Sequence, residues 1–440
     1  MRFRPVLFSL ALLAGPLPAQ QPAPPAGPSG PLSLLDAIRI GRDRGVAATL
    51  AQLNARIANQ RIGERRADVL PTISGLGAYS RQTENLDEFG ITFPGLPDVT
   101  DPFSLWRFRV GASQTVFDAS AFGRLRAARD SAAAAGLDAR AVGELGGATA
   151  GLAYLRTLSA RETVKAREAD SVVAATLLDQ ARQLVAAGVS PAIDATRSEV
   201  SFSAVRTDLE LARNAVDRTR LDLLRALDFP PATAVELADS LGLGAVDLPL
   251  DPDEAGRFAR ERRSELAAER NRTAAIRRTL GAIKAENLPS VGLNGYYQQS
   301  GIALDGLSGT YQVQLGVTVP ILDGFRRQAR AGEQQTRLDA QLVRERDLGN
   351  QVETEARQAV LDVASARQQV AIAGDRLRLA EQELAQAEER FRAGVAGSVE
   401  TTNAQSAVIA ARDALIQARV NYGTARVSAY RALGIIDQLQ

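Results

Sequence analysis

Residues 311–319 read YQVQLGVTV, and their pattern indicates the fold of the chain. Apolar and polar side chains alternate along this stretch without an error, which is typical of a β-strand with one apolar and one polar face. The run WRFRVGAS, residues 106–113, alternates in the same way. A partner run precedes each of them. We therefore predict two strand pairs, at about 70–80 with 104–117 and at about 288–298 with 310–321.

The length and the aromatic residues of these runs suit a membrane. Each run is about 9–11 residues long, which is the length of a tilted transmembrane strand. Aromatic residues gather at the ends next to the connecting loops, as in an interfacial girdle: Tyr79, Trp106, Tyr297 and Tyr311. The alternative is an ordinary soluble hairpin that packs on helices and keeps its polar face in water.

Two strand pairs cannot form a closed structure within one chain. Four strands form a sheet with two open edges, and a lipid bilayer does not tolerate unpaired edges. Several copies must then contribute strands to a shared barrel. Two copies would give about eight strands, whose interior is filled by side chains, whereas three would give about twelve and leave a lumen. The strands favour an oligomer of more than two chains.

A coiled-coil seam follows the second strand pair. Over residues 352–391, apolar residues recur at alternating spacings of four and three, a mean of about 3.5 that imposes a left-handed supercoil. No Pro interrupts residues 119–187 or 324–393, so each stretch allows a helix of roughly 100 Å. The helix before Gly188 is less regular, because Arg167 falls on its seam. The alternative for these helices alone is a structural coiled coil.

The chain also repeats itself. Ala187-Gly188-Val189 returns as Ala393-Gly394-Val395 at an offset of 206 residues. Leu70-Pro71 returns as Leu288-Pro289 at an offset of 218, and Phe117-Asp118 resembles Leu322-Asp323 at an offset of 205. The difference of 13 residues indicates a longer loop in the first half. We predict a first repeat over residues 32–235, a linker over 236–252, a second repeat over 253–434 and a C-terminal tail over 435–440.

The N-terminus predicts export. Residues 1–19 contain a basic start at Arg2 and Arg4, a short apolar run and a small residue before Gln20, the pattern of a secretory signal peptide. A Pro-rich linker follows over residues 20–31. The apolar run is too short to span a bilayer as a helix, which takes about 20 residues, and no later stretch is long and apolar enough.

Composition excludes several functions. The chain has no Cys and no His, which removes disulfides, His/Cys zinc sites, Ser-His-Asp triads and thiol nucleophiles. The formal net charge is +1, with both signs scattered along the chain, so nothing electrostatic favours nucleic acid. We expect no enzyme activity, no metal and no cofactor.

The order of these features resembles the TolC-like outer-membrane efflux protein family. The likeness is carried by the Leu-Pro strand entries at 70 and 288, the passage Val319-Pro320-Ile321-Leu322-Asp323-Gly324 with Arg326 and Arg327 after it, and the turns Ala187–Pro191 and Arg392–Val395. It spans nearly all of the mature chain. The resemblance implies a mainly α fold in which long coiled-coil helices form a periplasmic tunnel, with residues 236–252 in the equatorial region. Four strands per chain would contribute to a shared, trimeric, 12-stranded transmembrane β-barrel. The first half has Thr115-Val116-Phe117 where the second has Pro320, so the two strand-to-helix passages need not bend alike.

The resemblance also implies functional positions. The tunnel tip, where an adaptor's helical hairpin docks, would comprise the two helix turns: Gly188, Val189, Ser190, Pro191, Gly394, Val395, Ala396, Gly397 and Ser398. Some members narrow the tip with inward carboxylates. Glu400 matches the first such position, Asn403 departs from the second, and Asp194 is the equivalent of Glu400 in the first repeat. The alternatives are that the turns need Gly and Pro merely to reverse the helices, and that the carboxylates face helix dipoles.

Two arginines complete the candidate positions. Arg107 and Arg109 would point into the barrel lumen and tune selectivity, or are simply charges that face water. The resemblance implies a homotrimeric exit duct in the outer membrane of a Gram-negative-type bacterium, in contact with its lipid. It would work in efflux or type I secretion with a periplasmic membrane-fusion adaptor and an inner-membrane transporter of the RND, ABC or MFS type. The alternative is a periplasmic coiled-coil adaptor or structural protein without a pore.

Overall fold

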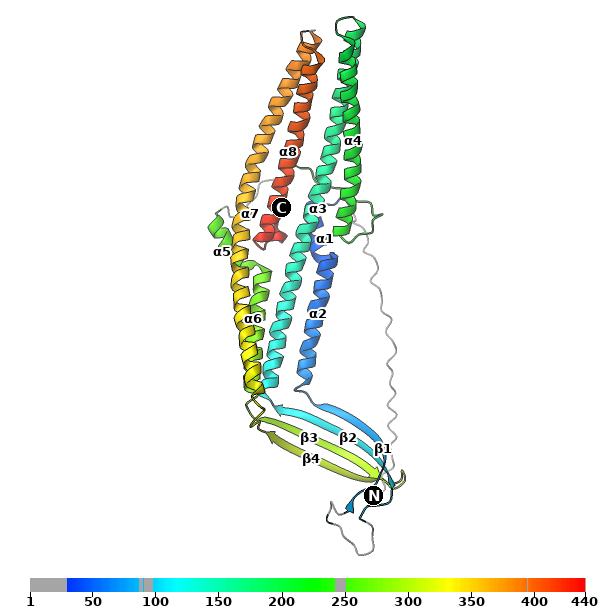
Figure 1. Ribbon diagram of the computed structural model, residues 1–440, viewed down its shortest axis with the longest axis vertical. Helices are drawn as coiled ribbons and strands as arrows, with labels where there is room; N and C mark the ends of the chain where they lie inside the picture. The colour runs from blue at the N-terminus through cyan, green and yellow to red at the C-terminus, as the bar shows by residue number, and fades with distance from the viewer. Residues whose placement is uncertain (1–29, 87–89, 91–97, 242–250, 394, 440) are drawn as a thin grey trace.

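The computed structural model describes residues 30–86, 90, 98–241, 251–393 and 395–439. The predicted signal peptide, residues 1–19, lies outside these ranges, as do residues 20–29 of the Pro-rich linker and 242–250 of the inter-repeat linker. Two long helical hairpins extend from a small sheet, and shorter helices pack beside them (Figure 1).

The two hairpins are of nearly equal size. Helix α3 (Ala119–Ala186) has 68 residues and turns back into α4 (Ala192–Ala226), which has 35. Helix α7 (Arg326–Arg392) has 67 residues and turns back into α8 (Ser398–Ala432), which also has 35. The longer helix of each hairpin is thus roughly 100 Å long. None of the described helices has an apolar stretch long enough to cross a membrane.

The shorter helices repeat as well. Helices α1 (Leu34–Arg44) and α5 (Pro252–Arg262) have 11 residues each, and α2 (Val46–Ala67) and α6 (Ser264–Ala285) have 22 each. A short 3-10 helix, Ile436–Gln438, follows α8. The equal lengths of these matched helices fit an internally duplicated chain.

The predicted seam lies where α7 meets α8. Every seam position from Ala356 to Phe391 that the 4-3 spacing selects is buried or half-buried. Near the upper part of the hairpin, Ala380 packs with Val408 and Ala411 of α8. Small Ala side chains on facing positions let the two backbones approach closely. The largest apolar clusters lie lower, where α1, α5 and the C-terminal turn pack around the middle of the long helices.

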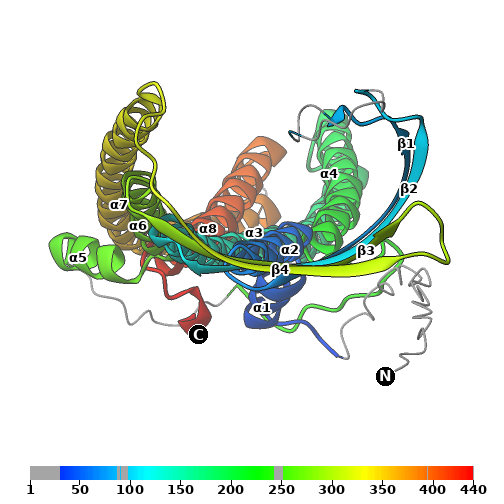
Figure 2. The same ribbon diagram turned by 90° about the horizontal axis from the view of Figure 1, so that it is seen from below.

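The sheet confirms the prediction of four strands. Strands β1 (Thr72–Gln82), β2 (Phe103–Phe117), β3 (Ser290–Gly301) and β4 (Ser308–Thr318) form one antiparallel sheet in that order. The pairing of β2 with β3 joins the two repeats. The sheet is strongly curved, and β1 and β4 form its two edges (Figure 2).

The two passages from strand to helix differ in structure. Strand β2 enters α3 through Asp118 alone, whose carboxylate caps the helix by accepting hydrogen bonds from the N–H groups of Ser120 and Ala121. Strand β4 enters α7 through residues 319–325, where Gly324 and Phe325 both have positive φ, 66° and 63°. These two left-handed residues lie directly before the start of α7. The two halves therefore bend differently, as Pro320 in only one of them suggests.

Candidate functional site: the sheet faces and the hairpin tips

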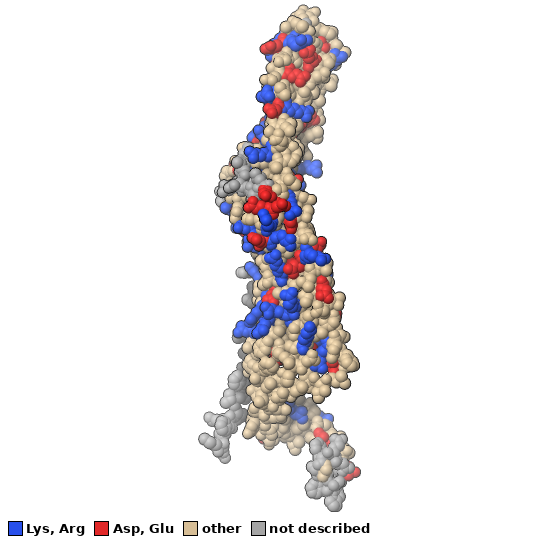
Figure 3. Space-filling view, turned by 90° about the vertical axis from the view of Figure 1, so that its left-hand side faces the viewer, with Lys and Arg blue, Asp and Glu red and all other residues tan. Residues whose placement is uncertain are grey.

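The strand registers sort the sheet into an apolar and a polar face. Tyr79 lies opposite Trp106, Val110 opposite Tyr297, and Tyr297 opposite Tyr311. Residues two apart share a face, so the apolar face carries Ile73, Tyr79, Trp106, Phe108, Val110, Leu293, Tyr297, Tyr311, Val313, Leu315 and Val317. Most of these side chains are exposed in the single chain. The space-filling view shows few charged side chains over this end of the molecule, whereas both signs are mixed along the helices (Figure 3).

The polar face carries the two predicted lumen arginines. Arg107 lies opposite Ala78 and Ser300, and Arg109 lies opposite Leu76 and Gln298. The rest of this face is formed mainly by Ser, Thr, Asn, Gln and Gly residues. None of the four strands contains an Asp or a Glu. The polar face is therefore positively charged.

Arg109 is held in place by two neighbours from β3. Its Nε donates a hydrogen bond to Gln298 Oε1 at 2.8 Å, and its guanidinium carbon lies 4.3 Å from the centre of the Tyr296 ring. The cation over the aromatic face adds a favourable electrostatic contact. Arg107 Nε is buried and has no hydrogen-bond partner among the described residues. Neither arginine is paired with a carboxylate on this face.

The first hairpin turn is closed by main-chain hydrogen bonds. Gly188 has φ 71°, the left-handed conformation that glycine adopts without steric cost. The N–H groups of Val189 and Ser190 both donate to Leu184 O, at 3.0 and 3.2 Å. Pro191 then precedes the first residue of α4. The turn therefore explains why Gly and Pro occupy positions 188 and 191.

The second turn has the same pattern of hydrogen bonds. The N–H groups of Val395 and Ala396 both donate to Arg390 O, at 3.0 and 3.3 Å, and Gly397 precedes α8. Gly394 lies outside the described residues. The two turns, predicted as a pair from the offset of 206, lie together at the end of the hairpins that is far from the sheet (Figure 1).

The structure joins the tips of the two hairpins through Asp194. This residue is only 5% exposed, and its Oδ1 accepts a hydrogen bond of 2.6 Å from Ser398 Oγ. Ser398 is buried as well and is the first residue of α8. Arg197 Nη1 lies 3.8 Å from the same carboxylate oxygen. Asp194 is therefore a contact between α4 and α8 in this state of the chain.

The other two predicted gate residues lie in different surroundings. Glu400 is exposed, and its Oε1 forms an ion pair of 2.9 Å with Arg390 Nε at the end of α7. Asn403 is exposed on α8, one turn after Glu400. The two residues share α8 with Ser398, but the structure brings only Ser398 together with Asp194.

A buried ionic cluster between α3 and α8 was missed by the sequence reasoning. Asp170 is 3% exposed and accepts hydrogen bonds from Arg167 of its own helix, at 2.9 Å, and from Arg412 of α8. Arg167 also donates to Asp413. Burial raises the pKa of the Asp170 carboxyl, and the two arginines act against that rise. The available signal was Arg167 itself, a charge on an apolar seam with an acid three residues later.

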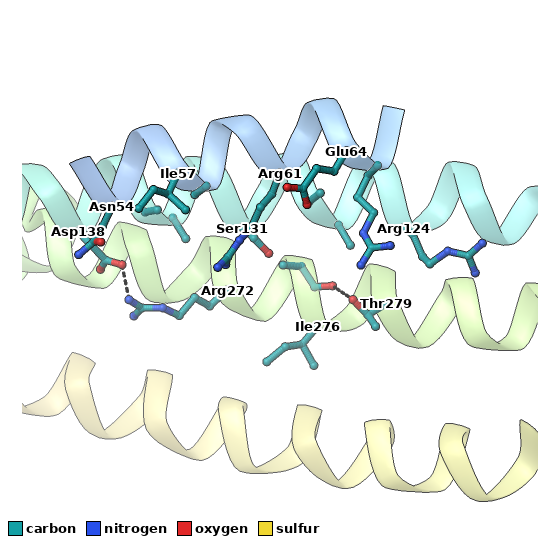
Figure 4. A pocket seen from close by; sticks show the side chains of 17 residues that line it. Asn54, Ile57, Arg61, Glu64, Arg124, Ser131, Asp138, Arg272, Ile276 and Thr279 are labelled. Atoms are coloured by element: carbon teal, nitrogen blue, oxygen red, sulfur yellow. Dashed lines mark hydrogen bonds and ion pairs between the residues drawn. The ribbon is translucent and has the colours of Figure 1, made fainter. Parts of the chain in front are cut away.

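A groove runs between α2 and α6 over α3. Its volume is about 920 Å³, and Ala side chains of α3 form much of its floor. Figure 4 shows charged side chains of both signs at its rim, among them Arg61 and Glu64 of α2, and the ion pair of Arg272 with Asp138. The described residues contain no group of three or more acids that would hold a metal ion.

Comparison with known proteins assigns the chain to a family. Residues 40–228 and 257–435 match the profile of the outer membrane efflux protein family. The chain belongs to this family. The two matched segments coincide with the two halves of the structure, so the duplication is a family feature. No curated protein matches the chain by sequence.

Solved structures with the same fold are outer-membrane proteins, two of them described as channels. The efflux chain is similar to the outer-membrane channel OprN, with a TM-score of 0.79 and 19% identity over 91% of this chain and 89% of that one. It is similar to VceC of Vibrio cholerae, with a TM-score of 0.78 and 15% identity over 91% and 96%. It is also similar to the open state of MtrE of Neisseria gonorrhoeae, with a TM-score of 0.77 and 19% identity over 92% and 90%.

Family membership establishes the function in outline. This efflux protein is an outer-membrane channel of tripartite systems, not an enzyme, and its helices form a large periplasmic portion. The alternative of an adaptor without a pore is thereby excluded. Membership also implies that the channel forms trimers and works with an adaptor and an inner-membrane partner.

Proposed function

We propose that three copies of this chain form one passive exit duct. Each copy contributes its four strands to a shared 12-stranded barrel, and its hairpins to a tunnel below. Solute enters at the hairpin tips and leaves through the barrel, driven by an inner-membrane transporter of the RND, ABC or MFS type. The observation that supports this most is the sheet itself, which has an apolar face, a polar face and two open edges. Lipid would cover the apolar face, water would contact the polar face, and a neighbouring copy would pair with each open edge.

The hairpin tips are the proposed docking and gating region. The turns at 188–191 and 394–398 would receive the helical hairpin of a periplasmic membrane-fusion adaptor. Asp194, Glu400 and Asn403 would line the gate. In the described state Asp194 and Glu400 are each engaged, with Ser398 and with Arg390. Opening would separate α8 from α4 and so break the hydrogen bond between Ser398 and Asp194.

Removing that hydrogen bond is expected to favour the open tip. In Ser398→Ala, Asp194 stays buried but loses its hydroxyl donor, a loss that costs about 1–3 kcal/mol. Single-channel recordings should show a higher mean conductance than the parent protein. Ser406→Ala is the matched control, because the exposed Ser406 hydroxyl donates only to Thr402 O within its own helix. Equal conductance of the Ser398→Ala and Ser406→Ala channels would remove this contact from the gate.

The polar face of the sheet would line the lumen and favour anions. Each chain places Arg107 and Arg109 on this face, and no strand supplies a carboxylate to neutralise them. Rings of Arg or Lys side chains favour anions in pores. We expect a chloride-over-potassium permeability ratio of about 5 at 0.1 M salt, falling at higher salt because screening shortens the reach of the charges.

Neutralising both arginines tests this assignment. The variant Arg107→Gln with Arg109→Gln should bring the permeability ratio to about 1, and Lys at both positions should keep it near the parent value. Arg81→Gln is the matched control, since Arg81 lies opposite Ser104 on the other face of the sheet and should not change the ratio. A parent channel without anion preference, or a preference that survives both Gln substitutions, would show that these arginines do not set selectivity.

A further inference from the structure

The two hairpins of the sheet are identical in register. Strand β1 pairs with β2 from Thr72 opposite Ser113 to Gln82 opposite Phe103. Adding the repeat offsets, 218 for the first strand of a pair and 205 for the second, gives Ser290 opposite Thr318 and Ser300 opposite Ser308. These are the first and last pairs that β3 and β4 make. The two offsets, visible in the sequence at Leu70-Pro71 and Phe117-Asp118, therefore hold throughout both hairpins.

The pairing of β2 with β3, which joins the two strand hairpins, indicates how the free edges of the sheet can pair. Strand β2 meets β3 with Arg109 opposite Gln298 and Ser113 opposite Asn294. In the duplicated chain, β4 is the equivalent of β2, and β1 is the equivalent of β3. The free edges of the sheet are therefore the two halves of a second junction of the same kind, which only another copy of the chain can complete.

We propose that β4 of one copy pairs antiparallel with β1 of the next, with Gln314 opposite Ser80. The offsets carry Arg109 to Gln314 and Gln298 to Ser80. Applying the same two offsets to the other β2–β3 pairs places Gln312 opposite Gln82, Gly316 opposite Ala78 and Thr318 opposite Leu76. The inference rests on the proposed shared barrel and specifies the interface that closes it. Because one edge meets a different edge, the contact is head-to-tail, the kind of contact that forms a ring when the rotation between successive copies closes.

The chemistry of both edges agrees with this register. Polar-face residues meet polar-face residues, since Gln312 and Gln314 face Gln82 and Ser80. On the other face, Leu315 meets Tyr79, and both are exposed in the single chain. A slip of one residue would place apolar side chains of one copy beside polar side chains of the next. The pairing should end near Pro320, which has no N–H to donate and lies at the equivalent of the β2–β3 irregularity near Thr115.

Introduced cysteines can test the register directly, because the chain has none of its own. Residues directly opposite in an antiparallel pair have Cα atoms about 4.5–5.5 Å apart, within the range of a disulfide. Mild oxidation of the Ser80→Cys, Gln314→Cys protein in outer membranes should give covalent dimers and trimers on a denaturing gel, with no larger species. Each single variant should give none.

Two displaced pairs serve as controls. Ala78→Cys and Gln82→Cys, each combined with Gln314→Cys, keep the same face but move one partner by two residues. We expect at least about tenfold less crosslinking from them, because diagonal neighbours exceed disulfide range. Stronger crosslinking by a displaced pair, or none by any pair in a channel that still conducts, would overturn the register alone. Failure to form any oligomer or pore would instead overturn the proposed function.

Discussion

Replacing Leu315 by Arg is expected to abolish membrane assembly of this channel. Leu315 lies in the middle of the apolar face of β4 and is 67% exposed in the single chain. If this face meets lipid, an arginine near the bilayer centre costs about 2–4 kcal/mol in each chain, and every copy carries the same penalty. The Leu315→Arg protein should be absent from heat-resistant oligomers in the outer membrane and should give no channels in bilayers.

Gln314→Arg is the matched control, since it introduces the same side chain one residue earlier on the polar face. This protein should assemble and conduct, with a stronger preference for anions. The comparison separates lipid exposure from mere surface exposure. An exposed position of a soluble hairpin accepts arginine readily, so normal assembly of the Leu315→Arg protein would mean that the apolar face does not meet lipid.

The second large effect concerns the ionic cluster between α3 and α8. Asp170→Ala removes the carboxylate that lies between Arg167 and Arg412, and leaves the half-buried Arg167 with Asp413 as its remaining partner. Breaking a buried ion pair by removing one partner costs about 3–5 kcal/mol. We expect a clearly lower temperature for loss of helical circular dichroism, with the hairpins loosened before the sheet end.

Two further variants separate the charge of the cluster from its packing. Glu381→Gln removes an exposed carboxylate 3.9 Å from Arg412 and should change stability by less than about 1 kcal/mol. Replacing Arg167, Asp170 and Arg412 together by Met, Leu and Met should recover most of the loss, because apolar side chains of similar volume often replace buried ion pairs without cost. A small effect of Asp170→Ala would contradict the view that the cluster joins the two hairpins.

Much of this fold could be predicted from sequence because its elements have strict periods. Residues 311–319 alternate without error, and β4 has the two faces that this alternation predicts. The seam from Ala356 to Phe391 keeps its 4-3 spacing and is buried or half-buried at every position. The change of the repeat offset from 218 to 205 indicates which loop differs in length between the two halves. Each of these signals is local in the chain or is repeated in it.

The candidate site was harder to predict because its contacts join residues far apart in sequence. Asp170 and Arg412 are separated by 242 residues, and no local pattern indicates that α3 meets α8 at that height. The tip positions of Asp194 and Glu400 follow from the resemblance, but burial of Asp194 against Ser398 depends on how α4 and α8 pack. Likewise, the ion pair between Arg390 and Glu400 forms across the second turn. Periodicity indicates which face of a helix is buried, but it does not indicate which other helix packs against that face.

Identical copies of the chain are proposed to pool their strands and so close one sheet in lipid. Native mass spectrometry of the mature protein, extracted with detergent from the outer-membrane fraction and checked for conductance in planar bilayers, tests this pooling most directly. We predict a single species with the mass of three chains that forms conducting pores. A water-soluble monomer that forms no pores would contradict the account.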